Sequence, residues 1–357
     1  MDASLPDRPR KGRGAVSNRS GRFEPHAYEP VDDGWLVEDL PPLRTTVTRD
    51  TSKTIVARNS SPDVPFDRSI NPYRGCEHGC VYCFARPTHA FLGLSPGLDF
   101  ESRLFYKPDA ARLLEEALLK PGYECRVMAM GTNTDPYQPI EREYRVTRSI
   151  LEVLSDCDHP VGIVTKSGLV VRDIDILAPM AARGLALVCI SVTTLDRRLA
   201  RLLEPRAPTP ARRIETIRRL ADAGIPTGVM AAPTIPGLTD HELEDILGAA
   251  RDAGAQSASY VLLRLPLEIA DLFVEWLQTH RPDRASRVLG LMRQAHGGKV
   301  YESAFGRRMS GKGPYAEMLA KRFETACRRF GLAEKRPELD TGSFKRPLRR
   351  GNQLALF

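Results

Sequence analysis

Three cysteines within a stretch of eight residues are the chemically most informative feature of the sequence. Cys76, Cys80 and Cys83 follow a C-x3-C-x2-C spacing, and Gly75 and Gly79 precede the first two of them. Glycine allows the backbone to turn tightly around a compact object. Thiolates at such spacing are ligands for a soft metal ion or for an iron–sulfur cluster. The segment therefore predicts a metal centre.

Two kinds of metal centre fit these cysteines. A zinc ion needs a fourth ligand, which His78 or His89 could supply, but zinc sites usually pair two cysteine knuckles and the sequence has no second C-x2-C. An iron–sulfur cubane held by three thiolates leaves one iron open to a substrate or a cofactor. Cysteines that only fill the core are a third, weaker interpretation, because a glycine-rich loop is a poor place for packing.

The remaining cysteines and the chain ends suggest a compartment. The seven cysteines are odd in number and lack framework spacing, which argues against a secreted disulfide scaffold. Cys125, Cys157 and Cys189 lie in or beside apolar runs and are interpreted as small core residues. No apolar run is long enough to span a bilayer, and the N-terminal arginines precede no signal-like run. We expect a protein of the reducing cytoplasm with no membrane partner.

Short apolar runs alternate with amphipathic helical patterns through the middle of the chain. Gly184, Gly224 and Gly254 each follow a helical pattern and precede an apolar run, as a glycine that ends a helix does. The runs predict strands buried on both faces. They are Val127–Met130, Val161–Thr165, Leu185–Val192, Thr227–Ala232 and Ser259–Leu265.

This alternation predicts an α/β fold with a parallel sheet. A further strand at Ile70–Arg74 gives six βα units, fewer than the eight of a closed barrel, so we expect a partial (β/α)6 barrel of the TIM type. A doubly wound open sheet is the alternative, because periodicity does not separate the two. Thr239 and Glu242 have the spacing of a capping box and predict a helix at Asp240–Ala253.

Four segments are expected along the chain. Residues 1–65 are interpreted as a mostly mobile N-terminal arm, with a short ordered piece near Trp35–Leu43, and residues 66–280 as the barrel. Residues 281–333 form a helical C-terminal extension, and residues 334–357 form a basic tail. The predicted helices of the extension are Ala285–His296 and Tyr315–Arg329.

Polar residues stand where the predicted strands end. Catalytic and binding groups of such folds gather at the carboxyl ends of the strands. Each residue has a simpler role as a turn, cap or surface group, but their common register with the cysteine loop favours a pocket. The residues are Thr134, Lys166, Ser191 and Arg264.

The cysteine loop after a first strand, with Tyr82 just before the third cysteine, resembles the radical S-adenosylmethionine superfamily over roughly residues 68–270. The resemblance implies a 4Fe–4S cluster on Cys76, Cys80 and Cys83, whose open iron chelates the amino and carboxylate groups of S-adenosylmethionine. It also implies an electron donor. One electron then cleaves the cofactor to a 5′-deoxyadenosyl radical, while the protein orients it and excludes water and oxygen.

The strand ends resemble the spore photoproduct lyase branch of this superfamily, which repairs DNA. The resemblance implies that Thr134 and Ser191 bind the methionyl or ribose part, that Lys166 pairs with the carboxylate, and that Tyr82 lies by the adenine. Those lyases carry a hydrogen-donating cysteine at the position of Thr132. Because a threonine cannot quench a carbon radical as a thiol does, Thr132 argues against spore photoproduct repair. No catalytic residue is assigned.

Basic residues suggest a polyanionic partner such as DNA. The formal charge is +7 and the pI is about 9.1. One basic segment follows the fourth strand and is either a solvated helix face, with ion pairs to Glu204 and Glu215, or a phosphate-binding rim. Its arginines are Arg197, Arg198, Arg201, Arg206, Arg212, Arg213, Arg218 and Arg219.

The chain ends in an apolar peptide. Gln353, Leu354, Leu356 and Phe357 resemble the short peptide by which bacterial replication and repair proteins bind the sliding clamp. In that mode the glutamine makes polar contacts and the apolar side chains fill a pocket. Docking on the protein's own core is the alternative.

Three functions remain open. The leading hypothesis is a radical S-adenosylmethionine enzyme acting on nucleic acid, in the manner of DNA repair. The second is a non-catalytic interaction module that binds zinc or an iron–sulfur cluster. The third is a radical enzyme that acts on protein or RNA.

Overall fold

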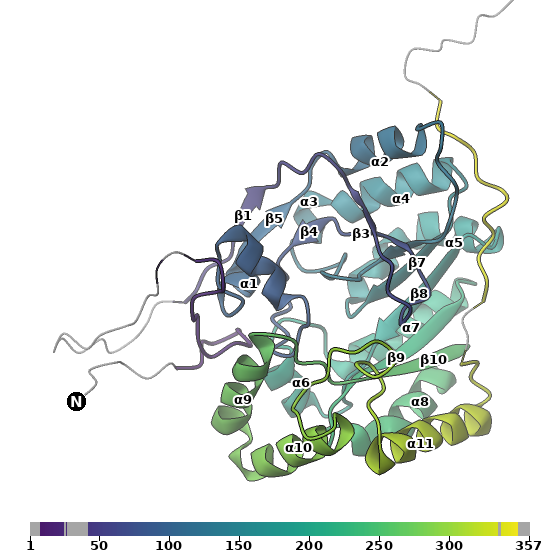
Figure 1. Ribbon diagram of the computed structural model, residues 1–357. Coiled ribbons are helices and arrows are strands. Elements are labelled where there is room, and N and C mark those ends of the chain that lie inside the picture. The colour runs from purple at the N-terminus through teal and green to yellow at the C-terminus, as the bar shows by residue number, and fades with distance from the viewer. Residues whose placement is uncertain (1–7, 25, 27–41, 335–336, 349–357) are drawn as a thin grey trace, which may run out of the picture.

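The computed structural model describes residues 8–24, 26, 42–334 and 337–348, and a seven-stranded sheet forms its centre (Figure 1). Six strands are parallel, and each pairs with the next of them along the chain. A doubly wound sheet would reverse this order at a switch point, so the predicted partial (β/α)6 barrel is confirmed. The parallel strands are β3 (Arg68–Ile70), β6 (Met128–Met130), β7 (Val161–Thr165), β8 (Ala186–Ser191), β9 (Thr227–Thr234) and β10 (Ser257–Leu262).

Helices follow each strand from β6 onward. A glycine follows the end of three of these helices, as predicted. Gly184, Gly224 and Gly254 have positive φ angles of 70°, 75° and 98°. Apolar side chains on one face of several of these helices pack with the strands and form the main core. The helices are α3 (Glu141–Tyr144), α4 (Val146–Asp156), η2 (Gly168–Asp173), α5 (Ile174–Ala182), α6 (Arg197–Leu203), α7 (Pro210–Asp222), η3 (Asp240–Glu242), α8 (Leu243–Asp252) and α9 (Ile269–His280).

The first βα unit is elaborated, and the strand predicted at Ile70–Arg74 is wrong as a single element. Pro72, which has no N–H to donate, separates β3 from β4 (Tyr73–Arg74), and the two belong to different sheets. The second sheet has the order β1-β5-β4. Its other members and the helices of this unit are β1 (Thr46–Arg49), η1 (Arg86–Leu92), α1 (Asp99–Ser102), β5 (Arg103–Tyr106) and α2 (Ala110–Leu118).

The C-terminal region is helical, as predicted. Helices α9, α10 (Pro282–Ala295) and α11 (Pro314–Phe330) lie on one side of the molecule, opposite α2 and α4, and α10 packs between the other two (Figure 1). The segment between α10 and α11 joins the two edges of the sheet. Leu262 at the end of β10 donates to the carbonyl of Met309 at 2.8 Å, and Gly306 donates to Asp63 at 2.7 Å. Asp63 follows β2 (Val56–Arg58), the antiparallel edge strand.

The predicted capping box is wrong. The hydroxyl of Thr239 accepts the N–H of Ile235 at 2.9 Å, and Glu242 reaches away from its own helix. The Glu242 carboxylate accepts the hydroxyl of Thr194 at 2.6 Å and also the N–H of Leu195. Because a local contact engages Thr239 and tertiary contacts engage Glu242, the helix begins with the short turn η3 instead of a reciprocal cap.

The described part of the expected N-terminal arm makes ordered contacts. Ala15 and Val16 are buried, and β1 and β2 each join a sheet. Periodicity did not predict these contacts, because they rest on backbone groups and on very short strands. The piece expected near Trp35–Leu43 lies mostly outside the described residues. Among the described helices, none is long and apolar enough to cross a membrane.

Candidate functional site

The cysteine loop follows β4 and folds back on itself in two tight turns. The N–H of Gly79 donates to the carbonyl of Cys76 at 3.3 Å, and that of Cys83 donates to Cys80 at 3.2 Å. Cys76 and Cys80 are buried, and Cys83 is half-buried. The two turns therefore gather three free thiols in one small region with restricted access to solvent.

Two glycines make this path possible. Gly75 and Gly79 have φ angles of 73° and 69°, in the left-handed region that other residues rarely adopt. A Cβ on Gly79 would lie 2.6 Å from a carboxylate oxygen of Glu101, and one on Gly75 would lie 2.8 Å from the carbonyl oxygen of Phe100. Glycine is therefore required at both positions by conformation and by space.

The thiols of the loop resist ionisation without a positive partner. Burial raises the pKa of Cys80 to about 12, and burial, followed by the charges of Asp135 and the other two thiols, raises the pKa of Cys76. Cysteine binds a metal as the thiolate. A positively charged metal centre would therefore stabilise the ionised form of these three cysteines. Among the described residues, no three Cys, His, Asp or Glu side chains already converge on a single metal ion.

A fully buried ion pair supports the loop from one side. Arg86 pairs with Glu101 at 2.5 Å and donates from Nε to the carbonyl of Cys80 at 2.9 Å. Glu101 in turn accepts the backbone N–H groups of Gly14 and Ala15, each at 2.8 Å. The N-terminal segment, the cysteine loop and α1 are thereby joined through one charged centre, which local sequence patterns did not reveal.

The segment after β6 holds the loop from the other side. The side-chain amide of Gln138 donates to the carbonyl of Gly75 at 3.1 Å and accepts the N–H of Glu77 at 2.9 Å. Both contacts flank Cys76. Thr134, from the same segment, donates its hydroxyl to the carbonyl of Tyr73 at 3.1 Å. The strand-end residues of β6 therefore fix the backbone on both sides of the first cysteine.

Asp135 links this segment to β7 and to the loop. Its carboxylate accepts the hydroxyl of Thr165 at 2.7 Å and the N–H of Lys166 at 2.8 Å, and lies 3.4 Å from Nδ1 of His78. Burial raises the pKa of Asp135, but His78 and these donors outweigh it and lower the value to about 2. The second histidine considered for zinc, His89, donates from Nε2 to the carbonyl of Arg103 at 2.9 Å.

The segment after α6 runs along the cysteine loop. The N–H of Val81 donates to the carbonyl of Leu203 at 3.0 Å, and the N–H of Arg206 donates to the backbone carbonyl of His78 at 3.2 Å. Glu204 lies between these two contacts and is buried with Arg213, with which it forms an ion pair. The expected solvated face with Glu204 is therefore wrong for this pair, whereas Arg218 and Glu215 do form an exposed ion pair at 3.3 Å.

Glu204 also accepts the hydroxyl of Tyr82, the residue before Cys83. Thr193, after β8, lies 3.0 Å from the same phenol oxygen and 2.8 Å from Glu204. Burial raises the pKa of Glu204, but the charges of Arg213 and Lys166 lower it to about 2. The result is a buried, ionised network directly beside the second and third cysteines.

The predicted strand-end residues converge on this region. The ammonium group of Lys166 lies 5.8 Å from the centroid of the Tyr82 ring. Burial lowers the pKa of Lys166, but the electrostatic interactions with Cys80 and with the carboxylate of Glu204 outweigh it and raise the value, so the group is charged. Ser191, at the end of β8, donates to the carbonyl of Ala232 at 3.4 Å.

Arg264, which follows β10, contacts the residue after the third cysteine. Its guanidinium carbon lies 4.7 Å from the centroid of the Phe84 ring, which follows the third cysteine and is 43% exposed. The Nε atom of Arg264 is buried and has no hydrogen-bond partner among the described residues. The sequence patterns did not single out Phe84, although its position next to Cys83 is a usable signal.

Comparisons with known proteins agree with this arrangement. A family model described as the Radical SAM superfamily matches residues 70–250. An uncharacterised protein of Mycobacterium tuberculosis is 37% identical over 233 residues, which are 65% of this chain and 68% of that protein. An uncharacterised protein of Methanocaldococcus jannaschii is 29% identical over 173 residues, 48% of this chain and 62% of that protein.

Solved structures of spore photoproduct lyase share the fold. The lyase complexed with dinucleoside spore photoproduct has a TM-score of 0.55 at 15% identity, over 81% of this chain and 80% of that chain. A double mutant of the lyase with bound AdoMet and the same dinucleoside has a TM-score of 0.56, with the same identity and coverage. At such low identity the likeness is one of fold.

Proposed function

The chain belongs to the radical S-adenosylmethionine superfamily, and from this premise we propose that it cleaves S-adenosylmethionine reductively at a 4Fe–4S cluster held by Cys76, Cys80 and Cys83. The observation that carries the proposal is the buried, doubly supported loop that gathers three free thiols. The donor set fits such a cluster, since soft thiolates are its usual ligands. When bound, the cluster and an external electron donor supply the electron that generates the 5′-deoxyadenosyl radical.

The protein's own residues would bind and orient the cofactor. Lys166, charged and close to Tyr82, is suited to pair with the cofactor carboxylate as a point charge. The ring of Tyr82 is held by Glu204 at its hydroxyl and would lie beside the adenine. Thr134 and Ser191, at the ends of β6 and β8, would contact the methionyl or ribose part.

We propose nucleic acid as the substrate. The exposed Phe84 and the half-buried Arg264 form an aromatic–guanidinium pair next to Cys83. Aromatic rings and guanidinium planes are the surfaces on which unpaired bases stack. The net charge of +7 favours the same class of substrate. The lyase that shares this fold was solved with a dinucleoside photoproduct, which is consistent with a repair-like role.

The reaction itself would differ from the lyase reaction. Thr132 stands where those lyases carry a thiol, and its hydroxyl lies 3.4 Å from the side-chain oxygen of Asn71. The amide N–H of Asn133 donates to the same oxygen at 3.1 Å. A hydroxyl tied into this turn is no substitute for a hydrogen-donating thiol, so we propose a different quenching step. The chemistry suits a reducing cytoplasm, where we expect the protein to act.

Metal analysis tests the cluster assignment. Protein purified and reconstituted without oxygen should contain about four irons and four sulfides per chain, because a cubane has that composition. Cys76→Ala, Cys80→Ala and Cys83→Ala should each lose the cluster, whereas Cys125→Ala, at a half-buried thiol outside the loop, should retain it. One zinc and no iron in the wild-type protein would instead support a non-catalytic zinc module.

The last five residues carry a separate proposal. We propose that Gln353, Leu354, Leu356 and Phe357 bind the bacterial sliding clamp, on the basis of their sequence. They lie outside the described residues. Wild-type protein should bind immobilised clamp, and Leu356→Ala/Phe357→Ala should not, while Leu348→Ala serves as a control nearby in the tail. Equal binding by the double variant and the wild type would remove this argument for DNA.

A further inference from the structure

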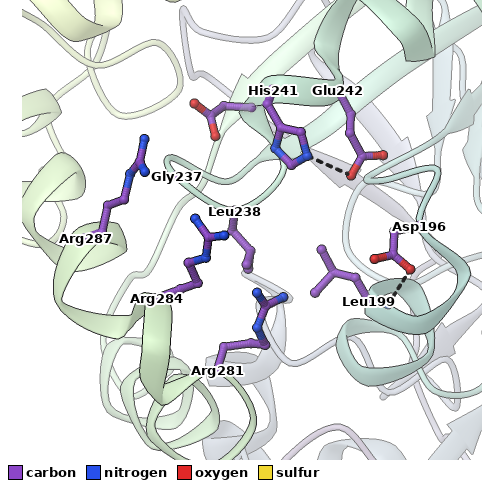
Figure 2. A pocket seen from close by; sticks show the side chains of 10 residues that line it. Asp196, Leu199, Gly237, Leu238, His241, Glu242, Arg281, Arg284 and Arg287 are labelled. Carbon is purple, nitrogen blue, oxygen red and sulfur yellow. Dashed lines mark hydrogen bonds and ion pairs between the residues drawn. The ribbon is translucent and has the colours of Figure 1, made fainter.

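A cavity of about 490 Å³ lies beside the candidate site, between helix α10 and the segments that follow β8 and β9 (Figure 2). Arg281, Arg284 and Arg287 line one wall, and Figure 2 shows all three on the same side of the cavity. Arg281 directly precedes α10, and the other two lie on it. The opposite wall includes Leu199, Gly237, Leu238, Asp240, His241 and Glu242. Because those segments follow the carboxyl ends of β8 and β9, the cavity opens at the end of the sheet where the cysteine loop lies.

The carboxylates of the cavity are already engaged by the protein's own donors. Asp196 accepts the N–H of Arg198 at 2.7 Å and that of Leu199 at 3.2 Å, which begins α6. Asp240 accepts the hydroxyl of Tyr315 at 2.8 Å. Glu242, as described above, accepts donors from the segment after β8. Each keeps its negative charge, but none of the three forms an ion pair with Arg281, Arg284 or Arg287 within the described residues.

The arginines, in contrast, are weakly partnered. Arg281 and Arg284 share one carboxylate, that of Asp283, each at 3.4 Å. Arg287 forms no ion pair within the described residues, and its side chain is exposed, as is that of Arg284. Arg281 and Arg284 also lie at the start of α10, where the helix dipole disfavours positive charge. An anion in the cavity would relieve this repulsion.

Helix α10, which carries Arg284 and Arg287, packs on the same apolar core as the cysteine loop. Val288 and Met292, on the inner face of α10, belong to the same buried apolar cluster as Val81 and Tyr82. On the other side, a Cβ on Gly237 would lie 3.4 Å from Cγ of Arg287, so the segment after β9 directly contacts the stem of that arginine. The packing of this core therefore sets how far α10 lies from the cysteine loop.

We infer that Arg281, Arg284 and Arg287 bind the backbone phosphates of the nucleic-acid strand whose base lies at Phe84; the inference rests on the proposed function and adds its phosphate-binding site. Guanidinium groups contact phosphate bidentately. Six residues of helix rise about 9 Å, which is enough for more than one phosphate of a strand. The row would set the register of the strand without reading its sequence.

Binding measurements on the full chain test this inference. Fluorescence anisotropy of a labelled 20-nucleotide single strand, titrated at several KCl concentrations, compares Arg281→Ser/Arg284→Ser/Arg287→Ser with the wild type. We expect at least tenfold weaker binding in 100 mM KCl and a smaller salt dependence, by about 0.7 in the log–log slope per lost phosphate contact. The double variant Arg284→Ser/Arg287→Ser, which leaves Arg281 at the N-cap of α10 unchanged, should show an intermediate loss.

A matched control removes three exposed arginines from α8 and α11, Arg251→Ser/Arg328→Ser/Arg329→Ser. An equal loss in this control, or unchanged binding and slope in the α10 variants, would overturn the inference. Inorganic phosphate and a mononucleotide are tested as competitors; if they bind the row tightly and the α10 variants still bind the strand normally, the site serves small phosphates instead.

The failure of this inference is separable from that of the proposed function. The α10 variants should cleave S-adenosylmethionine at the wild-type rate when no nucleic acid is present, because their substitutions do not touch the cofactor residues. If the wild type makes no 5′-deoxyadenosine, the proposed function fails. If it does and the variants bind the strand normally, only the phosphate site is wrong.

Discussion

The hydroxyl of Tyr82 donates to the carboxylate of Glu204, although the two residues are 122 positions apart in the chain. This contact ties the third cysteine of the loop to the segment after β8. Arg213 completes the arrangement by pairing with the same carboxylate, and all three side chains are buried. A buried ion pair is expensive to desolvate, so its presence beside Cys80 and Cys83 is best explained by the positioning of Tyr82.

The first prediction concerns this pair. Glu204→Leu alone leaves the guanidinium of Arg213 buried without its partner, and Arg213→Met alone leaves the carboxylate of Glu204 in the same state. Each should lower the free energy of unfolding by about 3–5 kcal/mol. The double variant should lose much less than the sum. Urea unfolding of the four proteins measures the cycle, and Glu215→Ala, at an exposed ion pair, should cost under about 1 kcal/mol. Additive losses would show that the pair does not act as a unit.

The second prediction is a pH dependence of stability. The pKa of Glu204 is lowered in the folded protein from 4.5 to about 2. The lowered pKa of Glu204 therefore contributes roughly 3 kcal/mol to the free energy of unfolding above about pH 4.5. This contribution is lost as the pH falls toward 2. Unfolding free energies of the wild type should fall more steeply over this window than those of Glu204→Leu/Arg213→Met. Parallel curves for the two proteins would contradict the assignment.

The candidate site was predictable from the sequence where its signals are local. The cysteine spacing with Gly75 and Gly79 identified the loop, and short apolar runs located the strands whose ends bring Lys166 and Ser191 to it. The support of the loop was not predictable, because Arg86–Glu101 and Glu204–Arg213 are pairs that only the tertiary fold brings into burial. Glu242 shows the opposite case, since its spacing fits a cap but a tertiary donor binds it instead.

The third prediction concerns Lys166. Lys166→Met removes a charged group close to Tyr82 and should raise the dissociation constant of S-adenosylmethionine at least tenfold, because its carboxylate loses a partner. Iron and sulfide content should stay at the wild-type level. Lys166→Arg, which keeps the charge, should recover part of the affinity. Equilibrium dialysis with the reconstituted protein measures binding, and unchanged affinity in Lys166→Met would remove the residue from the cofactor pocket.

The fourth prediction concerns Phe84. Phe84→Ala removes the exposed ring beside Cys83 and should weaken single-strand binding by about 1–3 kcal/mol, the usual range for one base–aromatic stack. Phe84→Trp should bind at least as well as the wild type. Met318→Ala, at an exposed apolar residue on α11, serves as the surface control in anisotropy titrations. Equal affinity of Phe84→Ala and the wild type would argue for a substrate without stacked bases.

The production of 5′-deoxyadenosine by the reduced, reconstituted protein tests the central claim most directly. The wild type should form 5′-deoxyadenosine and methionine from S-adenosylmethionine under dithionite, and addition of DNA, the proposed class of substrate, should increase the yield. Cys80→Ala should form neither, and Cys125→Ala should match the wild type. A wild-type protein that holds a full complement of iron and sulfide yet forms no 5′-deoxyadenosine would contradict the account.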